Sequence, residues 1–455
     1  SLFLACMDVG VIPVMALPAL RRAELEYLIS FSGARAIAIA PEYRGFDHAG
    51  LAHDLAYEIP GLEIIFTSAP ADGCVHLSSS SRNRKIGAHR GDPHDVALFL
   101  LSGGTTGMPK LIPRTHADYL YNARSAAQVC ALTSESRILL ALPAEHNFPL
   151  ACPGLLGAIL VGASASFSQS TQAEDLAEII HREKITHLPC VPTLAIALSD
   201  LPDESREMLR SMRVLTVGGQ KLQEPAARKF HKRYPWITIQ QVFGMAEGLL
   251  CYTHLGDPLE VAFTTQGRPL SPADEIKIVD ASGEPVLEGE VGELWCRGPY
   301  TIRGYYRAED RNLEAFSADG FYKTGDLVRR GGGGNLIVEG RIKDLINRGG
   351  EKINAEEIEA HLLAMHDLMI AAVVAMSDPA LGERACAYVK LRPGATLDLN
   401  TIRAHLEARG VARYKWPERL EIIAEMPLTN VGKIKKTELR ATIEKKIARE
   451  RAAKS

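Results

Sequence analysis

The chain has 455 residues, too many for a single hydrophobic core of typical size, so we expect two or more domains. Apolar residues make up 46% of the chain and charged residues 24%, which is ordinary for a globular protein in water. The net charge of −3 is nearly neutral and gives no sign of a nucleic-acid-binding surface or of a basic membrane-binding face.

The eight cysteines are scattered, with no C-x-x-C pair and no His/Cys cluster at the spacing of metal ligands. This pattern favours reduced thiols and a cytoplasmic location. No stretch approaches the roughly 20 apolar residues that a membrane-spanning helix needs, and the start of the chain lacks the pattern of a signal peptide. We therefore expect neither a nucleic acid nor a membrane among the partners.

The first hundred residues alternate between helix and strand patterns. Residues 1–10 predict an amphipathic helix, residues 11–17 a strand, residues 22–32 a helix and residues 36–40 the next strand. This βαβ order is typical of a parallel sheet. Residues 68–93 are rich in Ser, Gly and Asp without periodicity and predict an exposed connection.

A glycine- and threonine-rich loop follows the apolar strand pattern of residues 95–101, at the expected carboxyl end of that strand. Its glycines bring backbone N–H groups close to an anion, while its hydroxyls and lysine add donors and positive charge. Alone, such a loop fits a surface turn equally well. The P-loop of nucleotide hydrolases is excluded, because Met108 and Pro109 follow the last glycine and Leu111 replaces the magnesium-binding Ser/Thr. The candidate phosphate-binding residues are Ser102, Gly103, Gly104, Thr105, Thr106, Gly107 and Lys110.

A second candidate site lies between the buried strand predicted over residues 137–142 and the apolar helix predicted over residues 155–161. The corner between a strand and a helix in an α/β sheet is where ligands bind. Taken singly, each polar, aromatic or thiol side chain of this corner also fits a structural role as a helix cap or a core residue. The pocket candidates are His146, Asn147, Phe148 and Cys152.

Three later strand patterns end in residues that could contact a ligand. Residues 214–219 end in Gly218 and Gly219, where two glycines allow a flat ring to lie against the main chain. Phe243 and Glu247 follow the β-rich residues 236–242; the ring can stack, and the carboxylate is a hard oxygen ligand suited to Mg²⁺. In a third place, Asp326 stands on a glycine turn, where its carboxylate can accept two hydroxyl protons.

The rest of the chain predicts a β-rich region and then a compact α+β unit of about 110 residues. Four glycines at 331–334 predict the tip of a hairpin. In the α+β unit, helices are predicted over residues 354–364 and 400–409 and strands over residues 370–376 and 385–391. Near its end, Pro-Leu-Thr-Asn-Val-Gly precedes Lys433, while Lys435 and Lys436 predict a solvated face, as does the basic tail.

These motifs, in this order, resemble the adenylate-forming superfamily of acyl-CoA synthetases, luciferases and the adenylation domains of peptide synthetases, from about residue 1 to about residue 440. The resemblance implies an α/β fold with a large N-terminal domain of parallel-rich sheets flanked by helices (1–342), including a β-rich subdomain at about 265–342. A small mobile α+β domain would follow (343–455). Relative to the superfamily, the resemblance implies that an N-terminal segment is missing.

The resemblance also implies roles for single residues. Gly218, Gly219 and Phe243 would contact adenine, and Asp326 and Arg341 the ribose of ATP. The domain hinge would lie at Lys343, the metal ligand for Mg²⁺ would be Glu247, and the catalytic residues would be Lys433, Glu247 and His146.

Around residues 143–154 the chain resembles the stand-alone aryl-acid AMP ligases of siderophore biosynthesis. This resemblance implies that Asn147 hydrogen-bonds the ortho hydroxyl of the acid. Phe with Cys at the positions of Phe148 and Cys152 goes with salicylate, and Tyr with Ser goes with 2,3-dihydroxybenzoate. An unpaired 3-hydroxyl in such a pocket costs roughly 1–3 kcal/mol. The aryl-acid pocket would be lined by Asn147, Phe148, Cys152, Gln220, Val242 and Leu250, with Gln220 where this subfamily has a small residue.

The activity that the resemblance implies is a two-step ligation. The aryl acid, salicylate first of all, would react with ATP to an acyl-adenylate and pyrophosphate, and the acyl group would pass to the phosphopantetheine thiol of an aryl carrier protein. A 2,3-dihydroxybenzoate-AMP ligase and an aryl- or acyl-CoA ligase are the alternatives.

Overall fold

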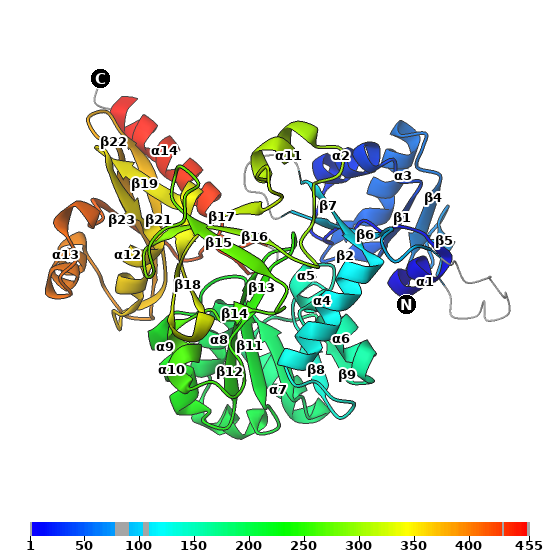
Figure 1. Cartoon of the computed structure of the whole chain (residues 1–455), viewed down its shortest axis with the longest axis horizontal. Coiled ribbons are helices and arrows are strands. Elements are labelled where there is room, and N and C mark those ends of the chain that lie inside the picture. Colours follow the sequence, from blue (N-terminus) through cyan, green and yellow to red (C-terminus); the bar gives the residue numbers. More distant parts are fainter. Residues whose placement is uncertain (1, 78–90, 103–108, 430–431, 453–455) are drawn as a thin grey trace. The chain divides into compact units, whose positions relative to one another are not determined.

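The structure, a computed structural model, describes residues 2–77, 91–102, 109–429 and 432–452. The chain separates into two compact units, one of residues 1–119 with 304–308 and one of residues 120–303 with 309–455 (Figure 1). The predicted domain boundary at residues 342 and 343 lies inside the second unit and stays a prediction.

The first unit contains a three-stranded parallel sheet in the order β1-β4-β5. An apolar core joins α2 and α3 to this sheet through Leu25, Ile29, Leu51, Leu55 and Leu62. The predicted helix over residues 22–32 and the strand that begins at residue 36 are confirmed. The elements are α1 (Leu2–Val9), α2 (Arg22–Ser32), β1 (Ala36–Ile39), β2 (Glu42–Tyr43), β3 (Phe46–Asp47), α3 (His48–Glu58), β4 (Ile64–Thr67) and β5 (Val75–His76).

One prediction for the first unit is wrong. Residues 11–17 form no strand but a single bridge between Val14 and Phe99, in which the Phe99 N–H donates to the Pro13 carbonyl at 2.9 Å. Pro13 itself has no N–H with which to extend a ladder. The predicted buried strand before the phosphate loop is confirmed as β6 (Val96–Leu101), which pairs antiparallel with β7 (Leu111–Thr115).

The second unit is built on a seven-stranded sheet in the order β14-β13-β12-β11-β10-β8-β9. Its strands β8 to β12 are parallel, as predicted, and β13 and β14 add to it antiparallel. The central strands β10 and β11 are buried along their whole length, as is typical of a parallel sheet that is covered on both faces. The strands are β8 (Arg137–Leu140), β9 (Ser164–Phe167), β10 (His187–Cys190), β11 (Val214–Gly218), β12 (Thr238–Gly244), β13 (Leu250–Tyr252) and β14 (Arg268–Pro269).

Helices connect these strands, and their residue patterns explain where they begin and which face is buried. In α7, Leu176, Ala177 and Ile180 recur at helical spacing and are buried, and α8 begins with a proline, which needs no N–H partner there. The helices are α4 (His116–Val129), α5 (Asn147–Ala151), α6 (Gly154–Val161), α7 (Ala173–Glu183), α8 (Pro192–Ser199), α9 (Glu224–Arg233) and α10 (Leu259–Thr264).

The predicted β-rich region is confirmed as a four-stranded antiparallel sheet in the order β15-β16-β17-β18, with α11 (Glu309–Ala315) before β17. The glycine run forms the tip between β17 and β18, and Gly333 there has a φ of +66°. The strands are β15 (Glu275–Val279), β16 (Gly292–Arg297), β17 (Tyr322–Arg330) and β18 (Leu336–Arg341).

The C-terminal residues form the predicted α+β structure, with a five-stranded sheet between two layers of helices. Successive residues of β21 and β22 point to opposite faces, so one set packs against α12 and α13 and the other against α14 (Figure 1). The elements are β19 (Leu345–Arg348), β20 (Glu351–Asn354), α12 (Ala355–Leu363), β21 (Leu368–Asp378), β22 (Gly382–Leu391), α13 (Leu399–Ala408), β23 (Arg419–Ile422) and α14 (Lys436–Ala452). In the part of the chain that the structure describes, no helix is long and apolar enough to cross a membrane.

Candidate active site

The candidate site of the second unit lies where the parallel strands end. The carboxyl ends of parallel strands meet at one edge of a sheet. There, the loop after β8 carries His146, the end of β11 carries Gly218 and Gly219, and the end of β12 carries Phe243. The register of the sheet places Gly218 opposite Val242, so these two predicted residues are direct neighbours.

The predicted aryl-acid corner forms a short helix, α5, that holds Phe148 against the sheet. His146 caps this helix, and its Nδ1 accepts a hydrogen bond from the Phe148 N–H at 3.3 Å. A Cβ placed on Gly218 would lie 3.2 Å from Phe148 Cζ and 2.5 Å from Val242 Cγ1. Only glycine permits this close approach, so the structure brings Phe148, Gly218 and Val242 together.

Cys152 ends α5 and is 1% exposed. Its Sγ lies 3.7 Å from Asn122 Nδ2, which also donates to the Ala151 carbonyl at 2.8 Å. The sequence analysis missed Asn122, which is fully buried on α4. A single asparagine within a helix pattern carries no signal for such a contact, because its neighbour lies 30 residues away in the chain.

The turn between β12 and β13 places the other predicted side chains of this region. Leu250 pairs with Gly244, and its N–H donates to the Tyr300 hydroxyl at 3.2 Å. Glu247 lies between Gly244 and Leu250 in the sequence and is 9% exposed. Its carbonyl accepts a hydrogen bond from the Ile302 N–H at 2.8 Å. The turn is therefore held at both ends, with a carboxylate buried inside it.

Asp326 and Arg341 face each other across β17 and β18. They are register partners, and Arg341 Nε donates to Asp326 Oδ1 at 2.6 Å. Asp326 is 3% exposed, and this burial raises the pKa of its carboxyl group, while the Arg341 guanidinium counteracts part of that rise. The pair therefore presents a carboxylate and a guanidinium, which together suit hydroxyl groups and an anionic group of one ligand.

Lys433 stands in a tight hairpin of the C-terminal residues and reaches the loop after β11. Its own N–H donates to Thr429 Oγ1 at 3.0 Å, and its carbonyl accepts from the Thr429 N–H at 2.6 Å. A Cβ placed on Gly219 would lie 3.1 Å from Lys433 Cε. The Lys433 side chain thus lies against the bare backbone of Gly219.

The charges around Lys433 come from several elements. Burial and the positive charge of Arg341 lower the pKa of Lys433 to about 8, while Asp326 and Glu247 act in the opposite direction. Burial and the Lys433 ammonium lower the pKa of His146 to about 3, so its imidazole is neutral near pH 7. His146 can therefore serve as a hydrogen-bonding group, and it does not act as a cation there.

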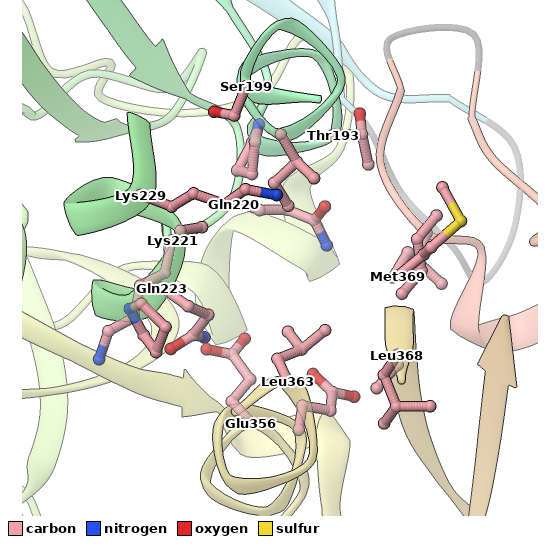
Figure 2. Close-up of a pocket in the computed structure, with 18 of the residues that line it drawn as sticks. Thr193, Ser199, Gln220, Lys221, Gln223, Lys229, Glu356, Leu363, Leu368 and Met369 are labelled. Atoms are coloured by element: carbon pink, nitrogen blue, oxygen red, sulfur yellow. The ribbon is translucent and has the colours of Figure 1, made fainter. Parts of the chain in front are cut away.

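Two predicted residues lie in other surroundings. Gln220 lines the cavity of Figure 2, which is bounded by α8, α9, α12 and β21 and includes Thr193, Lys221 and Glu356. Lys343 lies in a 3₁₀ turn directly after β18, and its carbonyl accepts two bonds from the Arg440 guanidinium, both 3.1 Å long. The aryl-pocket role of Gln220 and the hinge role of Lys343 stay predictions.

The prediction that Lys436 lies on a solvated face is wrong. Its side chain is 12% exposed, and Nζ lies 2.8 Å from Glu359 Oε1. Lys435 agrees better with the prediction, since its side chain is 43% exposed and its nearest carboxylate, Glu438, is 3.8 Å away. The partner of Lys436 comes from α12, more than seventy residues earlier, and no local pattern could reveal it.

The phosphate loop belongs to the first unit, and its residues 103–108 lie outside the described residues. At its base, the Lys110 N–H donates to Ser102 Oγ at 3.0 Å, and the Ser102 N–H donates to the Lys110 carbonyl at 3.1 Å. Lys110 Nζ lies 4.2 Å from the centre of the Tyr305 ring, a cation–π contact that the sequence analysis missed.

The described residues contain no group of three or more His, Cys, Asp or Glu side chains that could hold a metal ion by themselves. Mg²⁺ does not need such a group, because it commonly binds one or two carboxylates together with substrate phosphates. The buried carboxylate of Glu247 fits that mode of binding.

The chain is similar to known proteins along most of its length. The family model described as AMP-binding enzyme matches residues 1–306, and that of the AMP-binding enzyme C-terminal domain matches residues 357–433. The chain is 46% identical over 459 residues to the salicylyl-CoA synthase / salicylate adenylyltransferase of Streptomyces sp, which covers 97% of this chain and 82% of that protein. It is 44% identical over 443 residues to the 2,3-dihydroxybenzoate-AMP ligase of Bacillus subtilis (strain 168), with 97% and 82% covered. The structure is similar to the anthranilate CoA ligase AuaEII in complex with anthranoyl-AMP, with a TM-score of 0.88, 25% identity, and 98% of this chain and 85% of that chain covered.

Proposed function

The chain belongs to the family of AMP-binding enzymes, and we propose that it activates an aryl carboxylic acid, in the first place salicylate, with ATP. The single observation that carries the proposal is the close approach of Phe148 and Val242 to Gly218, directly before Gly219, against which Lys433 lies. This contact gives an apolar wall next to an ammonium group. A flat aromatic carboxylate needs both.

In the first step, a carboxylate oxygen of the acid attacks the α-phosphorus of ATP, the bond to the β-phosphate oxygen breaks, and pyrophosphate leaves. The acid is already ionised near neutral pH, so no general base is required. Negative charge develops on the phosphoryl oxygens, and catalysis then consists of positioning and electrostatic stabilisation. Lys433 would supply an ammonium group between the carboxylate and the α-phosphate.

The remaining side chains would bind and orient the nucleotide. Asp326 and Arg341 would hold the ribose, and the ring of Phe243 and the backbone of Gly218 and Gly219 would hold adenine. His146, which is neutral, would donate a hydrogen bond from Nε2, because its Nδ1 already accepts one from the Phe148 N–H. Ser102 and Lys110, with residues 103–107, would bind the phosphates.

Mg²⁺ would be held by Glu247 and by the phosphates of ATP. It would neutralise part of the charge that develops on the departing pyrophosphate.

The choice of acid would be made by Asn147, Phe148 and Cys152. Asn147 would hydrogen-bond the ortho hydroxyl, which both salicylate and 2,3-dihydroxybenzoate carry. Neither Phe148 nor Cys152 offers a hydroxyl to the additional 3-hydroxyl, and a polar group buried without a partner costs about 1–3 kcal/mol. Salicylate would therefore be preferred by about tenfold or more. The relatives include enzymes named for each of these acids, so 2,3-dihydroxybenzoate is the second candidate.

In the second step, a phosphopantetheine thiolate would attack the acyl carbon and AMP would leave. Lys433 occupies one face of the site, so the thiol would need the C-terminal residues to rotate about Lys343. The acceptor we propose is an aryl carrier protein of siderophore biosynthesis, and coenzyme A is the alternative. A cytoplasmic location stays a prediction from the scattered cysteines.

Acid-dependent exchange of pyrophosphate into ATP tests the proposal. Salicylate, 2,3-dihydroxybenzoate, benzoate and a medium-chain fatty acid would be compared at equal concentration. Exchange that is fastest with salicylate is the expected result. Exchange with the fatty acid alone would show that the site binds an aliphatic acid and not an aryl acid. Absence of exchange with every acid would refute adenylation. Purified carrier protein and coenzyme A, offered in parallel, would then identify the acceptor.

A further inference from the structure

Two neighbouring lysines after Lys433 have opposite environments. The Lys435 side chain is 43% exposed, whereas that of Lys436 is only 12% exposed and lies against the carboxylate of Glu359 at 2.8 Å; the Glu359 side chain is itself only 11% exposed. Removing two charges from water costs free energy unless they are paired and hydrogen-bonded. A buried pair only three residues from Lys433 therefore suggests a role that the exposed Lys435 does not have.

Glu359 is itself fixed in place. It lies on α12, and its Oε1 accepts the Val373 N–H of β21 at 2.6 Å. One carboxylate thus joins a helix, a central strand and the ammonium group of Lys436. Because Lys436 is the first residue of α14, the pair fixes the start of that helix relative to α12 and β21.

The described residues of the hairpin that carries Lys433 are joined by several hydrogen bonds of their own. Thr429 makes two backbone hydrogen bonds in it besides the side-chain bond to the Lys433 N–H, and Leu428 and Ile434 form a β-bridge across it. These internal bonds do not fix the position of the hairpin relative to the rest of the C-terminal residues. The contact of Lys436 with Glu359, where the chain leaves the hairpin, does fix this position.

The position of this hairpin matters because the Lys433 side chain has little room. It lies against Gly219, and a Cβ on Gly432 would lie 2.9 Å from Val191 Cγ2. Ile434 packs in part against the apolar cluster of β21, β22 and α14, and both Ile434 and Glu359 also line the cavity of Figure 2, so packing at this boundary of the hairpin is incomplete on the cavity side. An ion pair can hold the hairpin there where apolar packing is incomplete.

We propose that Lys436 and Glu359 are positioning residues, which hold the hairpin so that the Lys433 ammonium reaches the reacting carboxylate and α-phosphate. The inference rests on the adenylation activity proposed above. Both partners belong to the C-terminal residues and move together when those residues rotate. Loss of the pair should therefore impair the step that uses Lys433 and spare thiol transfer.

The test compares Lys436→Ala, Lys436→Arg and the matched control Lys435→Ala in the full chain, with Lys433→Ala as reference. Two reactions are measured: salicylate-dependent pyrophosphate exchange, and release of AMP from supplied salicyl-adenylate in the presence of the thiol acceptor. A misplacement of about 1 Å costs about a hundredfold in rate. We expect Lys436→Ala to lower kcat of exchange about 30- to 100-fold, with KM for salicylate and ATP and the rate of thiol transfer changed less than about threefold. Lys436→Arg should restore at least a third of the exchange rate, and Lys435→Ala should change neither reaction more than twofold.

Three results would overturn the inference. The first is an unchanged exchange rate in Lys436→Ala, and the second is a loss as large in Lys435→Ala. The third is an equal loss of exchange and thiol transfer together with a lowered melting temperature, because that result means the pair only stabilises the fold. If the unchanged protein shows no exchange, or if Lys433→Ala keeps full exchange, the proposed function fails instead, so the two failures are distinguishable.

Discussion

Gly219→Ala places a methyl group between the catalytic hairpin and the sheet. Its Cβ would lie 3.1 Å from Lys433 Cε, which is closer than ordinary contact, and 3.5 Å from Val191 Cγ1, which is already in contact. Carbon atoms in ordinary contact lie about 3.5–4.0 Å apart. The Lys433 side chain must therefore move by several tenths of an ångström.

This substitution has a backbone cost and a contact with Lys433, and a control variant separates the two effects. Gly219 has a φ of +84°, and an L-residue with this conformation costs about 1–2 kcal/mol. Gly289 has a φ of +86° and no atom within 4 Å of a Cβ, so Gly289→Ala carries the same backbone cost without the contact. The displacement of Lys433 adds a kinetic effect at position 219 alone, about tenfold to a hundredfold in the rate of adenylation.

The assay is pyrophosphate exchange together with thiol transfer from supplied adenylate, with thermal unfolding of both variants. Both variants should lose similar stability, and only Gly219→Ala should lose exchange. Its thiol transfer should stay within about threefold, because Lys433 serves only the first step. An equal loss of both reactions would mean that the methyl group blocks adenine and does not displace the lysine, which would refute the reasoning. An equal loss of exchange in Gly289→Ala would refute it as well.

Other outcomes follow from the same site. Lys433→Ala should abolish exchange and leave thiol transfer largely intact, and a parallel loss of both steps would contradict the rotation model. The double substitution Phe148→Tyr with Cys152→Ser should raise the preference for 2,3-dihydroxybenzoate over salicylate by about tenfold in competitive exchange, whereas an unchanged preference would point to Gln220 or another wall. Because the pKa of Lys433 is about 8, its ammonium is lost as the pH rises through that value; kcat/KM for exchange should fall on the basic side of pH 8, and Lys433→Arg should lack that fall. Asp326→Asn should raise KM for ATP more than tenfold in steady-state kinetics, since a carboxylate accepts two hydroxyl protons and an amide does not.

The helices and buried strands follow from short-range patterns. The helix predicted over residues 22–32 has those bounds in the structure, because its apolar spacing and the glycine that ends it are local features. The strand predicted over residues 11–17 failed for the opposite reason: its apolar residues suit a strand, but a ladder needs a partner and a donor that Pro13 lacks. The residues of β6 likewise do not determine that this strand pairs antiparallel with β7, because pairing depends on which strand packs beside it.

The candidate residues were found in the sequence because backbone-approach glycines, charged groups and hydroxyls occur there in a characteristic order. The chain itself specifies which side chains are available: Lys433, the paired glycines, the aromatic corner and the carboxylates. It does not specify their distances. The contact of Lys433 with Gly219, the lowered pKa of Lys433, the role of Asn122 beside Cys152 and the burial of Lys436 were decided only by the tertiary structure. Burial, charge environment and close approach are set by segments far apart in the chain, and no local periodicity records which segments meet.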